Sequence, residues 1–237
     1  MFPNINTSIP GWTSEFDLLC LAWLSRSVPA YSHIVEIGSL FGRTTSAIAS
    51  NRKPGTWMTA VDRFEDLPTG LDLDLWTASM FGDPTAVKEF MASAVEPRNW
   101  KHIFDQYVGA RENFIARQGF SQEYTAPTNT RLAFIDGNHE GQQPFDDIML
   151  FINMNECLVV VDDCHVDEFP DVIRALHKSR TASKRRLYSP GNSRMTLLIP
   201  PHGAMRDAAL QFITLTMYHD NPMDLRNAMC NPYWWPK

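Results

Sequence analysis

The residues from Ile34 to Thr45 constrain the fold more than any other part of this sequence. They read IVEIGSLFGRTT, an apolar run that passes through two glycines into a predicted helix. A buried strand, a glycine turn and a helix in this order are typical of the first unit of a nucleotide-binding α/β fold. For this stretch taken alone, an ordinary tight connection between a strand and a helix is the alternative.

The rest of the chain alternates between short β-branched runs and helical stretches, the pattern of a parallel sheet with helices on both faces. Several of the runs are apolar without alternation, as expected of strands that are covered on both sides. The fold class is therefore α/β, a Rossmann-like, doubly wound, mostly parallel sheet in a single domain. The predicted strands are His33–Ile37, Trp57–Val61, His102–Tyr107, Arg131–Ile135, Leu158–Val161, Leu187–Tyr188 and Met195–Ile199.

The length of 237 residues and the 44% apolar composition suit one compact domain. We expect an N-terminal helix over residues 13–28, an insertion over residues 64–100 that covers the substrate side as a lid, and an aromatic C-terminal tail over residues 220–237. Three roles stay open for the tail: docking on the domain, closing the substrate pocket, or forming the contact of a homo-oligomer.

Composition restricts the partners and the compartment. A formal net charge of −6 argues against a nucleic acid, because phosphate binding needs a surplus of Lys and Arg. The four cysteines are far apart, which favours reduced thiols over disulfides or a zinc site. The N-terminus lacks the pattern of a signal peptide, and no apolar stretch approaches the roughly 20 residues of a membrane helix. We therefore expect a cytoplasmic protein without a membrane partner that acts on a small molecule.

The glycine turn favours S-adenosylmethionine over a dinucleotide. In the GxGxxG fingerprint the second glycine lets the backbone approach a pyrophosphate, and Leu40 stands at that position here. S-adenosylmethionine has no phosphate and carries a sulfonium cation, which suits a turn of the form ExGxxxG that begins at Glu36. A second carboxylate, Asp62, follows the next predicted strand 24 residues after Gly38, near the roughly 20 residues expected for the acid that binds ribose hydroxyls.

Three further residues complete the predicted cofactor site. Ser39 and Gly42 belong to the glycine turn itself. Arg111 follows the third predicted strand, where a side chain or a backbone amide would reach the adenine. For the segment around Arg111 the alternative is an exposed turn whose residues cap a helix.

Three aspartates follow two further predicted strands. The chain reads LAFIDGNHE, with Asp136, and LVVVDDCH, with Asp162 and Asp163. Ligands of an open parallel sheet bind beyond the carboxyl ends of the strands, so these side chains converge near the cofactor. Their repulsion requires a cation, a proton or basic partners, and a divalent ion is the simplest solution. Oxygen ligands favour Mg²⁺, with Mn²⁺ or Ca²⁺ as alternatives. Helix capping by one member of the Asp pair is the structural alternative.

A histidine near the first aspartate is the predicted base. His139 lies three residues after Asp136, and an imidazole titrates near neutral pH. Asp136 and His139 are thus the predicted catalytic pair, with His165 in reserve. For either histidine alone, a hydrogen-bonded structural role is the alternative.

These motifs resemble the class I S-adenosylmethionine-dependent methyltransferases, between about Ser14 and Ile199. Within that class they resemble the branch of metal-dependent sugar O-methyltransferases of antibiotic pathways and cephalosporin-hydroxylase-like proteins. The motifs are VEIGSLFGRTT, AVDRF, IDGNHE with Asp147 in the next helix, and VVVDDCH followed by a helix with Val172 and Ala175. The resemblance implies cofactor contacts at Glu36, Gly38 and Asp62 and a metal at Asp136, Asp162 and Asp163. Catechol-type relatives place a lysine base where this chain has His139.

The sequence thus predicts an S-adenosylmethionine-dependent, divalent-metal-assisted O-methyltransferase acting on a small-molecule hydroxyl, that of a sugar or a phenolic natural product. One alternative is a hydroxylase-like or NAD-using oxidoreductase on the same fold, against which Leu40 argues. The other is a non-catalytic scaffold subunit that binds the cofactor. Three converging carboxylates argue against a scaffold, because a scaffold gains nothing from their repulsion.

Overall fold

The computed structural model describes residues 3–65, 73–92, 100–165, 167–231 and 236. Within this part of the chain, one seven-stranded sheet has the strand order β3, β2, β1, β4, β5, β7, β6. Neighbours from β3 to β5 run parallel, and β7 runs antiparallel to both β5 and β6. The predicted fold class is confirmed. The strands are β1 (His33–Ile37), β2 (Trp57–Asp62), β3 (Phe114–Gln118), β4 (Thr130–Ile135), β5 (Leu158–Val161), β6 (Arg186–Tyr188) and β7 (Thr196–Ile199).

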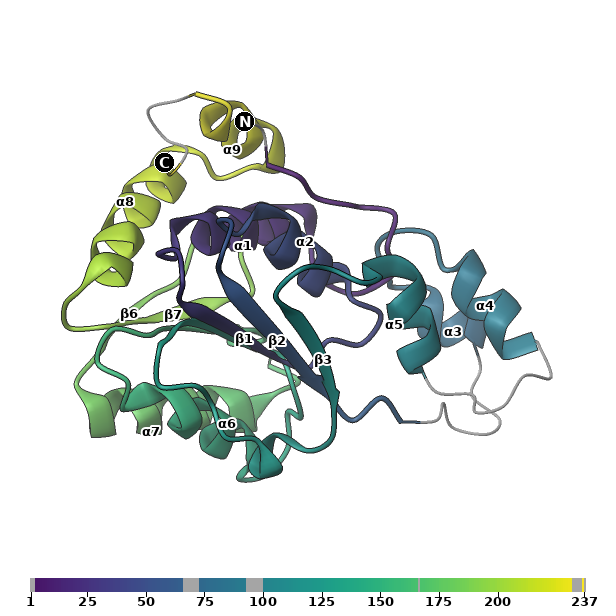
Figure 1. Cartoon of the computed structure of the whole chain (residues 1–237), viewed down its shortest axis with the longest axis horizontal. Helices are drawn as coiled ribbons and strands as arrows, with labels where there is room; N and C mark the ends of the chain where they lie inside the picture. Colours follow the sequence, from purple (N-terminus) through teal and green to yellow (C-terminus); the bar gives the residue numbers. More distant parts are fainter. Residues whose placement is uncertain (1–2, 66–72, 93–99, 166, 232–235, 237) are drawn as a thin grey trace.

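Helices lie on both faces of the sheet (Figure 1). One face is covered by α1, α2 and α8 and the other by α6 and α7, while α3, α4 and α5 lie at one end. Among the described residues, no helix combines the length and the apolar character that crossing a membrane requires. The helices are α1 (Glu15–Ser27), α2 (Arg43–Asn51), α3 (Leu73–Thr77), α4 (Thr85–Ala92), α5 (Trp100–Val108), α6 (Gln143–Ile152), α7 (Pro170–Ser183), α8 (Ala204–Tyr218) and α9 (Pro222–Met229), with a short 3₁₀ turn η1 (Ser121–Glu123).

The central strands are apolar on both faces because both faces are covered. Every residue of β1 is buried. Ile34 belongs to the core beneath α1 and α8, whereas the next residue, Val35, belongs to the core beneath α6 and α7. Successive side chains of a strand point to opposite faces. A sheet covered on both sides therefore produces continuous apolar runs, which is why the sequence identifies these strands without alternation.

Helix α1 begins with a capped N-terminus and lies within the predicted range of residues 13–28. The Ser14 hydroxyl accepts a hydrogen bond from the amide of Asp17 at 3.1 Å, and Glu15 and Asp17 place negative charge in the first turn, where the helix dipole favours it. The Ser193 hydroxyl donates to Asp17 at 2.5 Å. This bond ties the start of α1 to the loop that precedes β7.

The third predicted strand is wrong. His102–Tyr107 lies inside helix α5, and the strand is Phe114–Gln118. The buried residues of α5, Ile103, Phe104 and Val108, face one side of a helix, and an apolar run this short does not distinguish the two structures. The true β3 lies at the edge of the sheet and is only partly buried, so it lacks the apolar run that marks the central strands.

The position predicted for Arg111 is wrong for the same reason. Arg111 precedes β3 instead of following a strand, so it lies away from the carboxyl ends. Its guanidinium donates to the carbonyl of Val108 and to the hydroxyl of Ser50, each at 2.9 Å. Ser50 is in the last turn of α2, whereas the glycine turn leads into the first. Arg111 therefore joins the end of α5 to the end of α2, and its predicted contact with the adenine stays a prediction.

The described part of the 64–100 insertion packs on the glycine turn. The ring of Trp76, in α3, lies 5.9 Å from that of Phe41 and 5.4 Å from that of Trp12. The backbone of Phe81 pairs with that of Gly11. Residues 66–72 and 93–99 lie outside the described part, and so do the aromatic tail residues 232–235. The lid and the roles of the tail therefore stay predictions.

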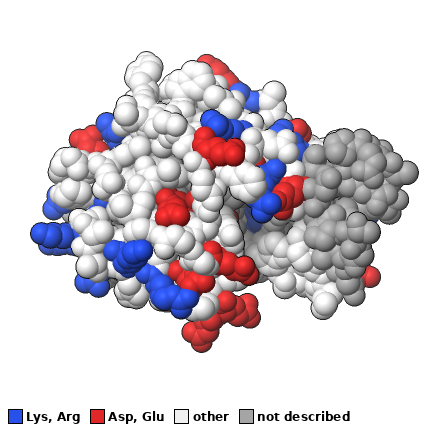
Figure 2. Space-filling view, turned by 90° about the horizontal axis from the view of Figure 1, so that it is seen from below, with Lys and Arg blue, Asp and Glu red and all other residues white. Residues whose placement is uncertain are grey.

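Charged side chains of both signs are spread over the face shown in Figure 2. Basic residues border a hollow near the end of α7, where positive charge complements the helix dipole. One of them, Arg185, is buried and donates to the carbonyls of Ile152 and Met154 at 2.8 Å each. Arg185 is thus a structural residue of the core. The hollow is lined by His177, Arg180, Thr181, Lys184, Arg185 and Arg186.

Candidate functional site

The glycine turn between β1 and α2 brings the two predicted sites together. Gly38 has φ +82°, and a Cβ atom on it would lie 1.9 Å from the backbone oxygen of Asp136. The Gly38 amide donates to the carbonyl of Val61 at 2.9 Å, and the Asp136 amide donates to that of Ile37 at 2.8 Å. Only glycine allows the turn to approach the loop after β4 so closely. The predicted cofactor turn and the first aspartate are thus immediate neighbours.

Glu36 lies beneath this turn and is fully buried. Its Oε1 atom accepts from the hydroxyl of Thr44 at 2.5 Å, and its Oε2 atom accepts from the hydroxyls of Thr45 and Ser39. Burial raises the pKa of Glu36 from 4.5 to about 7, although these hydrogen bonds favour the ionised form. Glu36 therefore joins the turn to the first residues of α2. Its direct contact with a cofactor stays a prediction.

Replacing Glu36 with glutamine is expected to flatten the pH dependence of stability. The folded protein holds the Glu36 proton up to a pH of about 7, whereas the unfolded chain loses it near 4.5. The free energy of unfolding of the native protein therefore falls as the pH rises between these values, by roughly 3 kcal/mol from this group. E36Q should lack that part of the fall.

Thermal unfolding at pH 5 and pH 8 measures the effect, with the exposed Glu112→Gln as the matched control. E36Q should gain stability relative to the native protein at pH 8, and E112Q should follow the native protein at both pH values. An equal loss of stability between pH 5 and pH 8 in E36Q and the native protein would contradict the assignment.

Asp62 ends β2, and its carboxylate accepts four hydrogen bonds. Oδ2 accepts from the backbone amides of Ser39 at 2.6 Å and Leu40 at 2.9 Å. Oδ1 accepts from the amide of Phe64 at 2.8 Å and from the indole of Trp100 at 3.0 Å. The structure thus places Asp62 against the glycine turn, where the spacing predicts it. No motif in the sequence points to Trp100, which reaches Asp62 from the start of α5.

Asp136, His139 and Asp163 form a compact group beyond β4 and β5. One ligand atom of each lies within 4.8 Å of those of the others. His139 Nε2 is 3.5 Å from Asp136 Oδ1 and 3.1 Å from Asp163 Oδ2. Asp162 lies outside this group, and its buried Oδ1 atom has no hydrogen-bond partner among the described residues. His165 is exposed and lies 3.4 Å from the Thr196 hydroxyl instead.

Burial and nearby negative charge shape the electrostatics of this group. Burial raises the pKa of Asp136 and of Asp162, and the neighbouring carboxylates add to the effect. Burial also lowers the pKa of His139. Asp163 adopts a φ of +57°, which is uncommon for a residue other than glycine. Crowded carboxylates with raised pKa values mark a place that is short of positive charge.

Two further polar residues at this edge were not predicted from the sequence. Arg194 forms an ion pair with Asp163. Asp17 accepts from Ser193 and is buried at the start of α1. Both Ser193 and Arg194 lie in the turn between β6 and β7. Because β7 is antiparallel, it begins at the edge where the parallel strands end. The position of Ser193 and Arg194 just before this strand is therefore the sequence signal that indicates them.

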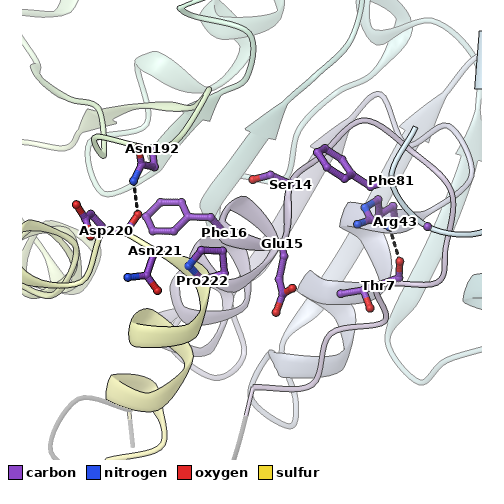
Figure 3. A pocket seen from close by; sticks show the side chains of 11 residues that line it. Thr7, Ser14, Glu15, Phe16, Arg43, Phe81, Asn192, Asp220, Asn221 and Pro222 are labelled. Atoms are coloured by element: carbon purple, nitrogen blue, oxygen red, sulfur yellow. Dashed lines mark hydrogen bonds between the residues drawn. The ribbon is translucent and has the colours of Figure 1, made fainter. Parts of the chain in front are cut away.

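A hollow of about 480 Å³ opens beside the start of α1 (Figure 3). Asn192 lines it and is followed directly by Ser193 and Arg194, so one loop leads from the hollow to Asp163. The buried Arg43 guanidinium, also in the lining, donates to backbone carbonyls of the N-terminal segment. The lining residues are Thr7, Ser14, Glu15, Phe16, Arg43, Phe81, Gly82, Asn192, Asp220, Asn221 and Pro222.

No family model matches the sequence, and no curated protein matches it significantly. Solved structures do match. CalS11, described as a calicheamicin methyltransferase, matches with a TM-score of 0.53 and 20% identity, over 77% of this chain and 78% of that one. The apo structure of CalS11, described as a TDP-rhamnose 3'-O-methyltransferase, has a TM-score of 0.51 and 18% identity over the same shares. A Corynebacterium glutamicum protein has a TM-score of 0.53 and 10% identity, over 78% of this chain and 80% of that one. The chain thus has the fold of class I S-adenosylmethionine-dependent methyltransferases.

Proposed function

We propose that this protein is an S-adenosylmethionine-dependent O-methyltransferase that uses a divalent cation and acts on the hydroxyl of a sugar or a phenol. One observation carries the proposal: the Gly38 turn closely approaches Asp136, one of the clustered aspartates. Asp62 holds this turn through the backbone amides of Ser39 and Leu40. A methyl donor on the turn would stand beside the groups that orient and deprotonate an acceptor. The likeness in fold to CalS11, which is described as a sugar O-methyltransferase, supports the same class.

The glycine turn would hold the cofactor. Asp62 is the acid for the ribose hydroxyls, and the backbone of Gly38, Ser39 and Gly42 would line the methionine part. Leu40 stands where a dinucleotide fold needs a second glycine next to the pyrophosphate, which favours a cofactor without phosphate.

The cluster of Asp136, Asp162 and Asp163 fits a hard divalent cation. Among the described residues, Asp162 Oδ1 and His139 Nε2 are buried without hydrogen-bond partners. Asp136 and Asp163 each offer an oxygen atom within 4.8 Å of a ring nitrogen of His139. Asp136, Asp162 and Asp163 would hold the ion, and their oxygen atoms favour Mg²⁺, with Mn²⁺ or Ca²⁺ as alternatives. When bound, the ion would compensate their charge and lower the pKa of the acceptor hydroxyl.

His139 is the proposed base. When bound, S-adenosylmethionine would supply the methyl group. The acceptor oxygen would take it as the carbon–sulfur bond breaks, and the electron pair of that bond would stay on sulfur in S-adenosylhomocysteine. The hydroxyl proton passes to His139 Nε2, the unpartnered atom that faces the carboxylates. Asp136, 3.5 Å away, stabilises the imidazolium that forms, and the ring of Phe169, 4.4 Å from the imidazole, fixes its orientation.

The hollow beside α1 is the proposed entrance for the acceptor. Its lining contains hydroxyl, amide and carboxyl side chains, those of Ser14, Asn192 and Glu15 (Figure 3). They now bond to Asp17, to the carbonyl of Asp220 and to Arg226, and a polyhydroxylated molecule would replace these partners. The loop that continues from Asn192 to Arg194 connects the hollow with Asp163.

Replacing His139 with alanine is expected to lower kcat by about 100-fold or more while the affinity for S-adenosylhomocysteine stays unchanged. Transfer of labelled methyl groups to a panel of phenols and sugars, with Mg²⁺ and then with EDTA, measures turnover. EDTA should abolish it and Mg²⁺ should restore it.

The exposed His202→Ala is the matched control and should turn over at the native rate. The affinity for Mn²⁺ separates a base from a metal ligand, because losing a base leaves that affinity nearly unchanged, whereas losing a ligand weakens it by about tenfold or more. Native turnover in H139A would rule out the proposed role.

A further inference from the structure

A basic side chain lies among the clustered carboxylates of Asp136, Asp162 and Asp163. The guanidinium of Arg194 forms an ion pair with Asp163 Oδ1, while Asp163 Oδ2 faces His139 at 3.1 Å. The side chain of Asp163 is 5% exposed, so this partner compensates a buried charge. Arg194 thus contributes part of the positive charge that three converging aspartates require.

The backbone of Arg194 is fixed by a hydrogen bond, whereas its side chain is partly exposed. Its carbonyl accepts from the Cys164 amide at 3.0 Å, which ties the turn before β7 to the loop after β5. The side chain itself is 37% exposed. Its Nε atom is buried without a hydrogen-bond partner among the described residues. Its guanidinium forms an ion pair with Asp163, and its charge also lowers the pKa of Asp17, Asp136 and Asp162. Because the side chain is partly exposed, rotation about its own bonds can break the ion pair with Asp163 while the backbone stays in place.

We propose that Arg194 is a displaceable counter-ion, which holds Asp163 while the metal site is empty and releases it when a divalent cation binds. The inference rests on the metal-binding part of the proposed function. A guanidinium and a divalent cation on the same buried carboxylate would repel each other strongly, because a partly buried site screens charge poorly. The partial exposure of Arg194 gives its side chain a way out toward solvent. Metal binding therefore works against the ion pair, and the ion pair lowers the affinity for the metal.

Calorimetric titration of the whole chain with Mn²⁺ tests this directly. Arg194→Gln should bind Mn²⁺ about tenfold more tightly than the native protein, because no ion pair has to be broken. Arg194→Lys keeps the charge but loses the planar guanidinium contact, and its affinity should fall between the two. The lysine variant keeps the test decisive if R194Q does not fold. Arg206→Gln, which removes an exposed ion pair with Asp207, is the matched control and should bind as the native protein does.

Thermal unfolding supplies a second measurement. In EDTA, R194Q should unfold at a lower temperature than the native protein because Asp163 loses its partner, and saturating Mn²⁺ should remove that difference. Equal or weaker Mn²⁺ binding by R194Q and R194K than by the native protein would overturn the counter-ion role alone. No Mn²⁺ binding by any of these chains would overturn the metal site together with this inference, and binding of S-adenosylhomocysteine would then still decide whether the cofactor site stands.

Discussion

Replacing Asp62 with asparagine is expected to weaken the binding of S-adenosylhomocysteine by about 100-fold. A hydrogen bond to a charged group contributes about 1.5–3 kcal/mol. The ribose hydroxyls would replace two of the four donors that Asp62 now accepts from, and in D62N they would lose the charged acceptor. An asparagine would also place the hydrogens of its NH₂ group against backbone amides that now donate to Asp62. Depending on which way the side chain is turned, these are the amides of Ser39 and Leu40 or the amide of Phe64. The turn and the ribose site should fail together.

Isothermal calorimetry on D62N gives the dissociation constant. Asp105→Asn is the matched control, because Asp105 is an exposed residue of α5 that pairs with Lys101 at 2.5 Å. The control should bind S-adenosylhomocysteine as tightly as the native protein. Native affinity in D62N would show that the ribose does not bind at this carboxylate.

The second large effect is expected from Gly38→Ala. Its Cβ atom would lie 1.9 Å from the backbone oxygen of Asp136, and backbone atoms of two adjoining strand ends would have to separate. The left-handed conformation at φ +82° adds roughly 1–2 kcal/mol for a residue with a side chain. We expect a loss of more than about 4 kcal/mol in the free energy of unfolding, together with the loss of cofactor binding.

Gly109→Ala separates the two causes. Gly109 has a similar φ of +64°, but a Cβ atom there would meet nothing within 4 Å. It should therefore lose only about 1–2 kcal/mol, the cost of the conformation. Urea denaturation of both variants measures the difference. If G38A were no less stable than G109A, the close contact between the turn and Asp136 would not exist in solution.

The fold could be predicted from the sequence where strands are buried on both faces. β1, β4 and β5 are continuous apolar runs because helices cover both sides, and their ends agree with the prediction to within a residue. The edge strand β3 carries no such run, whereas α5 buries a short apolar run that resembles a strand. The same error placed Arg111 after the third strand, because the position of Arg111 relative to the sheet depends on which segment is the strand.

The site could be predicted in part for a related reason. Asp62, Asp136 and Asp163 end strands, and the carboxyl ends of parallel strands meet at one edge, so their convergence follows from the strand order. Arg194 reaches the same edge from the turn before the antiparallel strand β7. Trp100 reaches it from the end of the insertion. Their positions depend on how distant segments pack, which a local motif does not reveal.

Calorimetric titration of the whole protein with S-adenosylhomocysteine, in Mg²⁺ and in EDTA and with NAD as the control ligand, tests the proposed function most directly. Selective binding of S-adenosylhomocysteine is the predicted result, and a stronger signal in Mg²⁺ would support the metal site beside it. Binding of NAD would contradict the assignment of the glycine turn to a methyl donor and favour an oxidoreductase, and binding of neither ligand would contradict that assignment as well.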